Sequence, residues 1–83
     1  MYQKRYNIVL KCVGANVRRI RVEKGLTMER LANEAEIEYR QLGRIERGEV
    51  NTTIISLLRI ADILQTDISQ FFVALPPVQA SHT

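Results

Sequence analysis

The sequence predicts an all-α domain built from five helices. Apolar residues recur every three or four positions along most of the chain, the spacing that places them on one face of a helix. Glycine, threonine and aspartate stand between these periodic segments, where helices end and begin. No segment shows the two-residue alternation of a half-buried strand, and the chain contains no internal repeat. We therefore expect helices alone to form the core.

The first helix is predicted over residues 7–24. Its inner stripe starts at Val9 and continues through Val13, Val17 and Ile20, at i, i+4, i+8 and i+11. Gly25 follows, and glycine closes helices because it adopts positive φ without steric cost.

Two shorter helices joined by a tight turn are predicted between Gly25 and Gly48. Thr27 is a good N-cap for the first of them, and Ile37 is a single apolar anchor in the turn. The residues expected to face inward are Leu31, Ala32 and Ala35 in the first helix and Leu42 and Ile45 in the second. The residues expected to project outward from the second are Tyr39, Arg40, Gly43, Arg44 and Arg47.

A fourth helix is predicted over residues 54–64 and a fifth over residues 68–75. Thr52 or Thr53 can cap the fourth, and Asp67 can cap the fifth. The inner stripe expected for the fourth helix is Ile54, Leu57, Leu58, Ala61 and Leu64. Because Pro76 and Pro77 stop any helix, we expect one domain over residues 1–75 and a mobile tail over residues 76–83.

Composition excludes several classes of protein. Twelve Lys and Arg residues against nine Asp and Glu residues give a net charge of +3, a weak hint of a polyanionic partner. The single Cys12 cannot form an intramolecular disulfide, which fits a reducing cytoplasm. No signal peptide and no apolar run of about 20 residues is present, so we expect no membrane association.

No catalytic, metal or cofactor site is expected either. The only histidine, His82, lies in the predicted tail, and one Cys with one His cannot build a usual zinc site. No glycine-rich phosphate loop occurs. Periodicity alone leaves two hypotheses for residues 25–48: a helical hairpin with a solvated basic face, or a helix shaped to enter the DNA major groove.

Four segments carry a family resemblance: GANVRRIRVEKGLT, ERLANEA, RIERGE and LLRIADIL. With them the chain, over about residues 13–72, resembles the Xre/Cro-type helix-turn-helix family, the lambda-repressor-like DNA-binding domains. The resemblance implies a five-helix domain with the helix-turn-helix at helices 2 and 3. It further implies a partner, double-stranded DNA, and a domain that usually acts as a dimer.

The resemblance also implies roles for particular residues. The start of helix 3 and one position a turn later would read base edges, here Tyr39, Arg40 and Arg44. Phosphates would be bound by residues flanking the helix-turn-helix, here Thr27, Met28, Arg47, Asn51, Thr52 and Thr53. An ion pair would join Arg21 of helix 1 to Glu46; the alternative is two independent surface charges.

Three positions depart from the family pattern. Glu36 stands where the turn usually has glycine, and a side chain there at positive φ costs about 1 kcal/mol or more. Met28 replaces a polar residue and can offer a phosphate only its backbone N–H. Glu38 is a poorer N-cap than the usual Ser or Thr. Two carboxylates beside the expected DNA surface should also weaken non-specific binding.

The function expected is that of a sequence-specific transcriptional regulator, similar to phage Cro-like repressors or restriction–modification controllers. It would bind as a homodimer to a two-fold-related operator, with one helix 3 in each of two major grooves about 34 Å apart. The expected dimer surface comprises Ile63, Phe71, Phe72 and Leu75, joined by Val73. The alternative for both phenylalanines is the monomer core.

Two other functions use the same fold. An antitoxin of a toxin–antitoxin pair would bind a partner protein as well as DNA. A protein–protein adaptor would have lost DNA binding, which Arg40, Arg44 and Arg47 argue against and Glu36 and Glu38 leave open.

Overall fold

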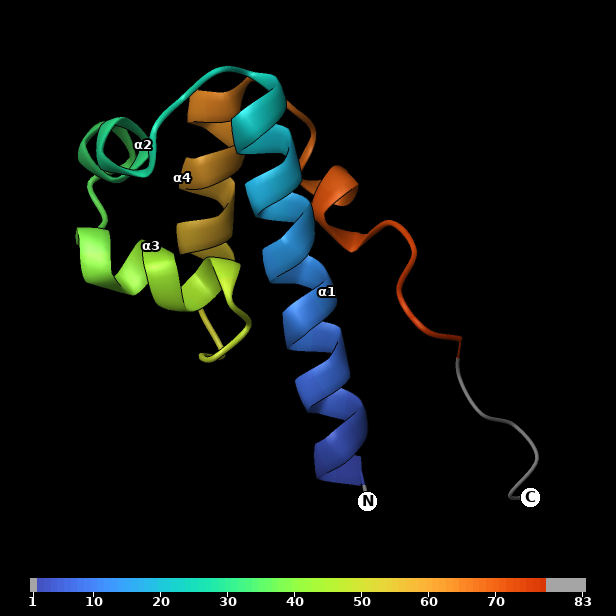
Figure 1. Cartoon of the computed structure of the whole chain (residues 1–83). Coiled ribbons are helices and arrows are strands. Elements are labelled where there is room, and N and C mark those ends of the chain that lie inside the picture. The colour runs from blue at the N-terminus through green and yellow to red at the C-terminus, as the bar shows by residue number, and fades with distance from the viewer. Residues whose placement is uncertain (1, 78–83) are drawn as a thin grey trace.

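The computed structural model describes residues 2–77, which fold into four α-helices followed by a short 3-10 helix (Figure 1). These residues contain no strand, so the all-α prediction is confirmed. The elements are α1 (Tyr2–Glu23), α2 (Met28–Ala35), α3 (Tyr39–Glu46), α4 (Ile54–Leu64) and η1 (Ile68–Phe72).

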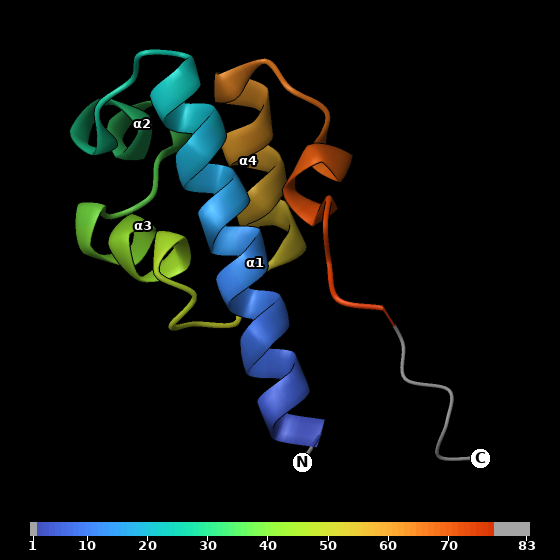
Figure 2. The same ribbon diagram turned by 45° about the vertical axis from the view of Figure 1, so that its right-hand side comes forward.

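The 22-residue α1 forms the spine of the molecule. α4 lies beside its C-terminal half, α2 and α3 lie on one side of this pair, and η1 lies on the other (Figures 1 and 2). The N-terminal half of α1 runs on past α3 and α4. None of the helices described is long and apolar enough to cross a membrane.

The core draws on every element. Its largest fully buried side chains are Phe71, Leu31, Leu42, Ile60, Leu64 and Val17. Removal of this apolar surface from water is the main favourable term in folding. The inner stripes predicted for α2 and α3 are buried as expected.

α1 begins at Tyr2, five residues before the predicted start. The apolar stripe that predicts the helix starts only at Val9, which is half-buried against the core. The preceding residues contain no glycine or proline to stop the helix, so it continues through them, although residues 4–8 are exposed or only half-buried.

α4 has the predicted bounds, and Thr53 caps it by accepting a hydrogen bond from the Ser56 amide at 3.0 Å. Its orientation differs from the prediction. Ile60 is fully buried, whereas Ile54 and Leu58 are 64% and 42% exposed. The buried set Leu57, Ile60, Ala61 and Leu64 has the same helical period as the predicted set, so periodicity could not choose between the two rotations.

The fifth helix differs from the prediction in type and length. Asp67 caps it as predicted, accepting from the Ser69 amide at 2.9 Å, but it is a 3-10 helix that ends at Phe72. The buried Asn16 amide group donates to the carbonyl oxygens of Phe71 and Val73, both at 2.9 Å. These bonds satisfy carbonyls that a longer helix would use internally, and Val73 is extended.

The predicted place of Phe71 in the dimer surface is also wrong. Its side chain is fully buried in the monomer core, so it cannot contribute to the dimer surface expected from the sequence. The chain after η1 returns along α1: Cys12 Sγ lies 3.4 Å from the Ala74 carbonyl oxygen, and Arg5 donates to the Pro77 carbonyl at 3.1 Å. Residues 78–83 of the predicted tail, including His82, lie outside the described residues.

Candidate nucleic-acid interface

The turn between α2 and α3 sets the angle between the two helices. Thr27 Oγ1 accepts from the Arg30 amide at 3.1 Å and caps α2. α2 ends at Glu36, whose φ of 57° and ψ of 45° are left-handed. The Ile37 amide then donates to the Ala32 carbonyl at 2.9 Å, which closes the helix end. The turn thus has the geometry that favours glycine, and Glu36 adopts it at a cost of about 1 kcal/mol.

α3 begins directly after this turn. Glu38 precedes it in an extended conformation, and its side chain makes no capping hydrogen bond. Leu42 and Ile45 fix the inner face in the core, while Tyr39 at the start of the helix is 59% exposed. Arg40, Arg44 and Arg47 are also exposed. The three base-reading candidates on α3 are therefore all accessible to solvent.

Two shallow depressions lie beside these base-reading candidates. The first is bounded by Glu38, Arg40, Gln41 and Arg44. The second is bounded by Thr27, Met28, Glu29 and Tyr39, so it joins the first turns of α2 and α3. The structure thereby brings two of the phosphate-binding candidates, Thr27 and Met28, next to Tyr39, whereas Arg40 and Arg44 line the first depression.

Gly43, which was expected to project outward, is instead buried, and Met28 and Arg47 both lie over it. A Cβ at Gly43 would lie 3.0 Å from Arg47 Nη1 and 3.4 Å from Met28 Cε. The Met28 side chain is thus half-buried against α3, and its backbone N–H is what it can offer to an anion at the α2 N-terminus.

Arg47 is held by a neighbour that the sequence analysis did not select. Its Nε lies 2.9 Å and its Nη2 3.3 Å from the two Glu49 carboxylate oxygens, and both side chains are about half exposed. The hydrogen bond from Arg47 is the main reason that the pKa of Glu49 lies below its ordinary value, with smaller contributions from Arg44 and Lys11. The same bond raises the pKa of Arg47. The two residues flank Gly48, outside the regular helix, so helical spacing could not indicate the pair.

The loop after α3 places the remaining phosphate candidates. Asn51 and Thr53 are exposed, and Thr52 is half-buried. The Thr53 hydroxyl is engaged in capping α4 and donates to Ser56 Oγ at 3.0 Å. Asn51 makes no hydrogen bond within the described residues, so its amide faces solvent with both donors available.

Arg21 and Glu46 form a buried ion pair behind this surface. Arg21 Nε lies 2.7 Å from Glu46 Oε2, and the two residues are 8% and 7% exposed. The pair joins α1 to the last residue of α3. Elsewhere in residues 2–77, no group of three or more His, Cys, Asp or Glu residues is arranged to hold a metal ion.

Comparison with known proteins finds similarity to helix-turn-helix proteins in sequence and in structure. Residues 17–71 match the model of a protein family described as helix-turn-helix. The chain is 41% identical over 54 residues to an uncharacterized HTH-type transcriptional regulator, y4dJ, of Sinorhizobium fredii, spanning 65% of this chain and 70% of that regulator.

Two solved structures are similar along most of the fold. The restriction-modification controller protein C.AhdI from Aeromonas hydrophila superposes with a TM-score of 0.74 at 30% identity, over 76% of this chain and 96% of that one. A single-residue variant of the restriction-modification controller protein C.Esp1396I has a TM-score of 0.72 at 36% identity, over 81% of this chain and 87% of that one.

Proposed function

The chain belongs to the helix-turn-helix family of transcriptional regulators, and we propose that it binds a two-fold-related DNA operator as a homodimer. α3 is the reading helix, and each subunit places it in one of two successive major grooves about 34 Å apart. The cytoplasm is the compartment in which it acts. Its similarity to two restriction-modification controller proteins supports a role of that kind.

The observation that carries the proposal is the pair of free arginines on α3. Arg40 and Arg44 line one depression, and neither guanidinium makes an ion pair or hydrogen bond within the described residues. An arginine fork can donate to both O6 and N7 of guanine, a contact worth about 1–3 kcal/mol of discrimination against another base. Tyr39, beside them, contacts a phosphate or a thymine methyl group.

Glu38 adds selectivity to this depression. Its carboxylate lies at the same rim as Arg40 and Arg44. A negative charge there opposes a closely approaching phosphate but accepts a hydrogen bond from cytosine N4. Non-specific complexes, which depend on phosphates, therefore lose more than the specific one.

Phosphate contacts surround the reading helix. The backbone amides at Thr27 and Met28 point from the start of α2, where the helix dipole favours an anion. Arg47 and the loop residues Asn51, Thr52 and Thr53 lie at the other end of α3. Arg47 must exchange its bond to Glu49 for a phosphate, and since both side chains are half exposed this exchange is inexpensive.

The dimer surface lies around η1. Phe72 and Val73 are 36% and 38% exposed, and Ile63 and Leu75 are partly buried against the core. Contiguous exposed apolar residues on a small domain mark an interface. A second copy of the chain would bury these four side chains, while Phe71 lies in the core of each monomer.

Selection of bound sequences from random duplex DNA tests the proposal. We expect enrichment of a two-fold-symmetric motif whose half-site centres are separated by about 10 base pairs. No enrichment, with the protein folded, would contradict the proposal and favour the adaptor function instead. An asymmetric or single half-site would keep α3 as the reading helix but contradict the homodimer.

A further inference from the structure

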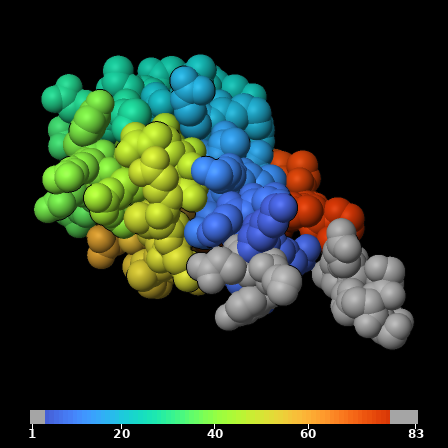
Figure 3. All heavy atoms as spheres, turned by 60° about the horizontal axis from the view of Figure 1, so that its bottom comes forward, coloured from blue at the N-terminus to red at the C-terminus, as the bar shows by residue number. Residues whose placement is uncertain are grey.

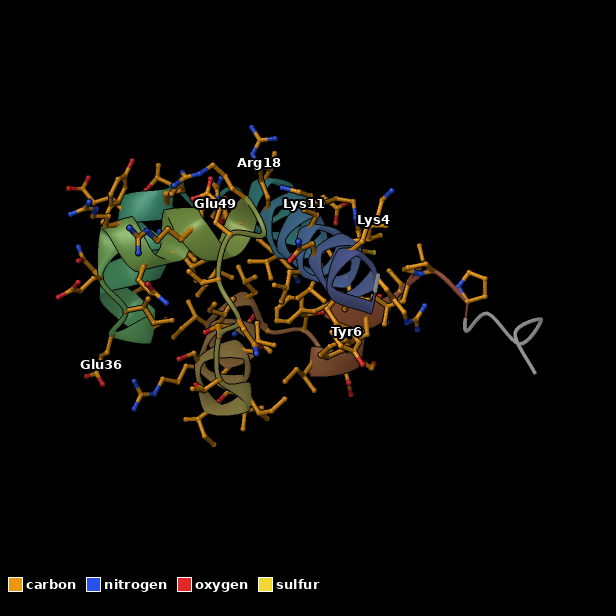
Figure 4. The ribbon with its side chains drawn as sticks, turned by 90° about the horizontal axis from the view of Figure 1, so that it is seen from below. Lys4, Tyr6, Lys11, Arg18, Glu36 and Glu49 are labelled. Atoms are coloured by element: carbon orange, nitrogen blue, oxygen red, sulfur yellow. The ribbon has the colours of Figure 1, made fainter. Side chains whose placement is uncertain are left out.

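α1 carries a row of cations that the functions above do not use. Lys4, Lys11 and Arg18 are spaced seven residues apart, close to two helical turns, so they lie on one face. All three are exposed, and none forms an ion pair or hydrogen bond within the described residues. Figure 4 shows them directed away from the body on the side where α3 and Glu49 lie.

The positive charge of the whole chain is concentrated in this helix. α1 holds six of the twelve Lys and Arg residues but only one of the nine acidic residues, Glu23. The rest of the chain therefore has more acidic than basic residues, six basic against eight acidic. Clustering of cations along one helix face is the electrostatic pattern of a surface that binds a polyanion.

Two close approaches fix this row relative to the reading helix. A Cβ at Gly14 would collide with the Ile45 carbonyl oxygen, and one at Gly48 would lie 2.5 Å from Lys11 Cα. α1 therefore crosses the end of α3 in backbone contact, with Lys11 beside the Arg47–Glu49 pair. Figure 3 shows the end of α3, the loop after it and α1 as one continuous surface.

We propose that Lys4, Lys11 and Arg18 bind phosphates of the same duplex that α3 reads. The row rises about 21 Å along α1, at about 1.5 Å per residue, and so lengthens the DNA contact well beyond the loop after α3. The inference rests on the proposed function. It adds a sequence-independent contact from a helix segment that lies outside residues 17–71, apart from Arg18.

Charge-removing variants measured on DNA test this role. Lys4→Gln and Lys11→Gln are compared with Arg59→Gln, which removes one exposed, unpaired positive charge from α4. Binding is measured across a salt series on the selected operator and on a random duplex. Lys11→Arg, which keeps the charge, should bind like the wild type.

We expect each lysine variant to reduce the slope of log affinity against log salt by about 0.9 on both duplexes. At about 0.1 M salt this corresponds to roughly eightfold weaker binding. The selected motif should not change, and Arg59→Gln should match the wild type. Circular dichroism shows whether each variant is folded. If Lys11→Gln does not fold, Lys4→Gln still tests the inference, because Lys4 is remote from the core.

If both lysine variants bind like Arg59→Gln while the wild type binds its operator, the row is ordinary solvated surface and this inference is wrong, although the proposed function stands. The same conclusion follows if the lysine variants change the selected motif but not the salt slope. A wild-type protein that binds no DNA would contradict the inference and the proposed function together.

Discussion

The Arg21 guanidinium donates two hydrogen bonds to the Glu46 carboxylate, from Nε to Oε2 at 2.7 Å and from Nη2 to Oε1 at 3.1 Å. Its Nη1 donates to the Leu26 carbonyl oxygen at 2.9 Å. One side chain therefore connects α1, the end of α3 and the loop that leads into α2. The angle of α3, which carries the residues proposed to read bases, therefore depends on this contact.

We expect removal of either partner to cost much more than a surface ion pair. Arg21→Ala or Glu46→Ala leaves a buried charge uncompensated and should lower the free energy of unfolding by about 3–5 kcal/mol. A double-mutant cycle by urea denaturation should give a coupling energy of about 1–3 kcal/mol. The exposed Arg19–Glu23 pair is the control, with coupling below about 0.5 kcal/mol. Equal coupling in the two pairs would contradict the prediction.

Asn16 should hold η1 against α1. Asn16→Ala leaves the Phe71 carbonyl oxygen without its donor and the Val73 carbonyl oxygen with only the Cys12 thiol, so we expect a loss of about 1–3 kcal/mol in the free energy of unfolding. Asn16→Asp should cost at least as much, because a carboxylate has no hydrogen to donate. Cys12→Ala should cost less, since a thiol is a weak donor. Chemical denaturation measures all three, and an Asn16→Ala protein as stable as wild type would refute the role.

Glycine should stabilise the turn before α3. Glu36 has a φ of 57°, so Glu36→Gly relieves backbone strain and should raise the free energy of unfolding by about 0.5–1 kcal/mol. Gln65→Gly, at a φ of 54°, should behave alike. Asn33→Gly inside α2 is the control and should destabilise by about 0.5–1 kcal/mol. Thermal unfolding would contradict the prediction if all three substitutions lowered the midpoint.

Arg44 and Arg47 should affect DNA binding in different ways. Arg44→Ala removes a base contact, so discrimination at one base pair of each half-site should fall by about 1–3 kcal/mol. Arg47→Ala removes a phosphate contact, so affinity should fall evenly for all sequences and the salt slope should decrease by about 0.9. Selection from random DNA and salt titrations separate the two effects. An unchanged motif for Arg44→Ala would mean that α3 does not read bases in this way.

The protein should be a homodimer at micromolar concentration, because Phe72 and Val73 otherwise face water. Sedimentation equilibrium should give about twice the chain mass, and Phe72→Asp should reduce it to the monomer with the helical circular dichroism signal retained. Phe71→Asp should instead unfold the chain, since Phe71 is fully buried. A wild-type monomer at several hundred micromolar would rule out the predicted dimer.

The sequence predicted a helix correctly where a capping residue and an apolar stripe mark its ends. α4 follows from the Thr53 cap and an apolar stripe that ends at Leu64, and α2 follows from the Thr27 cap. Each of these signals lies within a few residues of the helix end that it determines. The same holds for most of the outer face of α3, where the exposed residues are Tyr39, Arg40, Arg44 and Arg47. Gly43 is the exception, because the side chains of Met28 and Arg47 cover it.

Three features could not be predicted from the sequence, because each depends on contacts between residues that are distant along the chain. η1 ends where it does because Asn16 bonds to the Phe71 carbonyl, 55 residues along the chain. The buried face of α4 depends on which rotation lets Ile60 pack, and both rotations have the same period. The row formed by Lys4, Lys11 and Arg18 has a regular spacing, but its place beside α3 follows from the backbone crossing at Gly14 and Gly48.

The division of α3 into two faces has a consequence for how such regulators diverge. Leu42 and Ile45 hold the helix in the core, whereas Tyr39, Arg40 and Arg44 face solvent. If these residues read bases as proposed, substitutions at the three positions should alter which operator is recognised and change the free energy of unfolding by only about 0.5 kcal/mol or less. A duplicated gene can therefore drift to a new binding site through a few changes on an unaltered scaffold, and an engineer can retarget the protein by the same route.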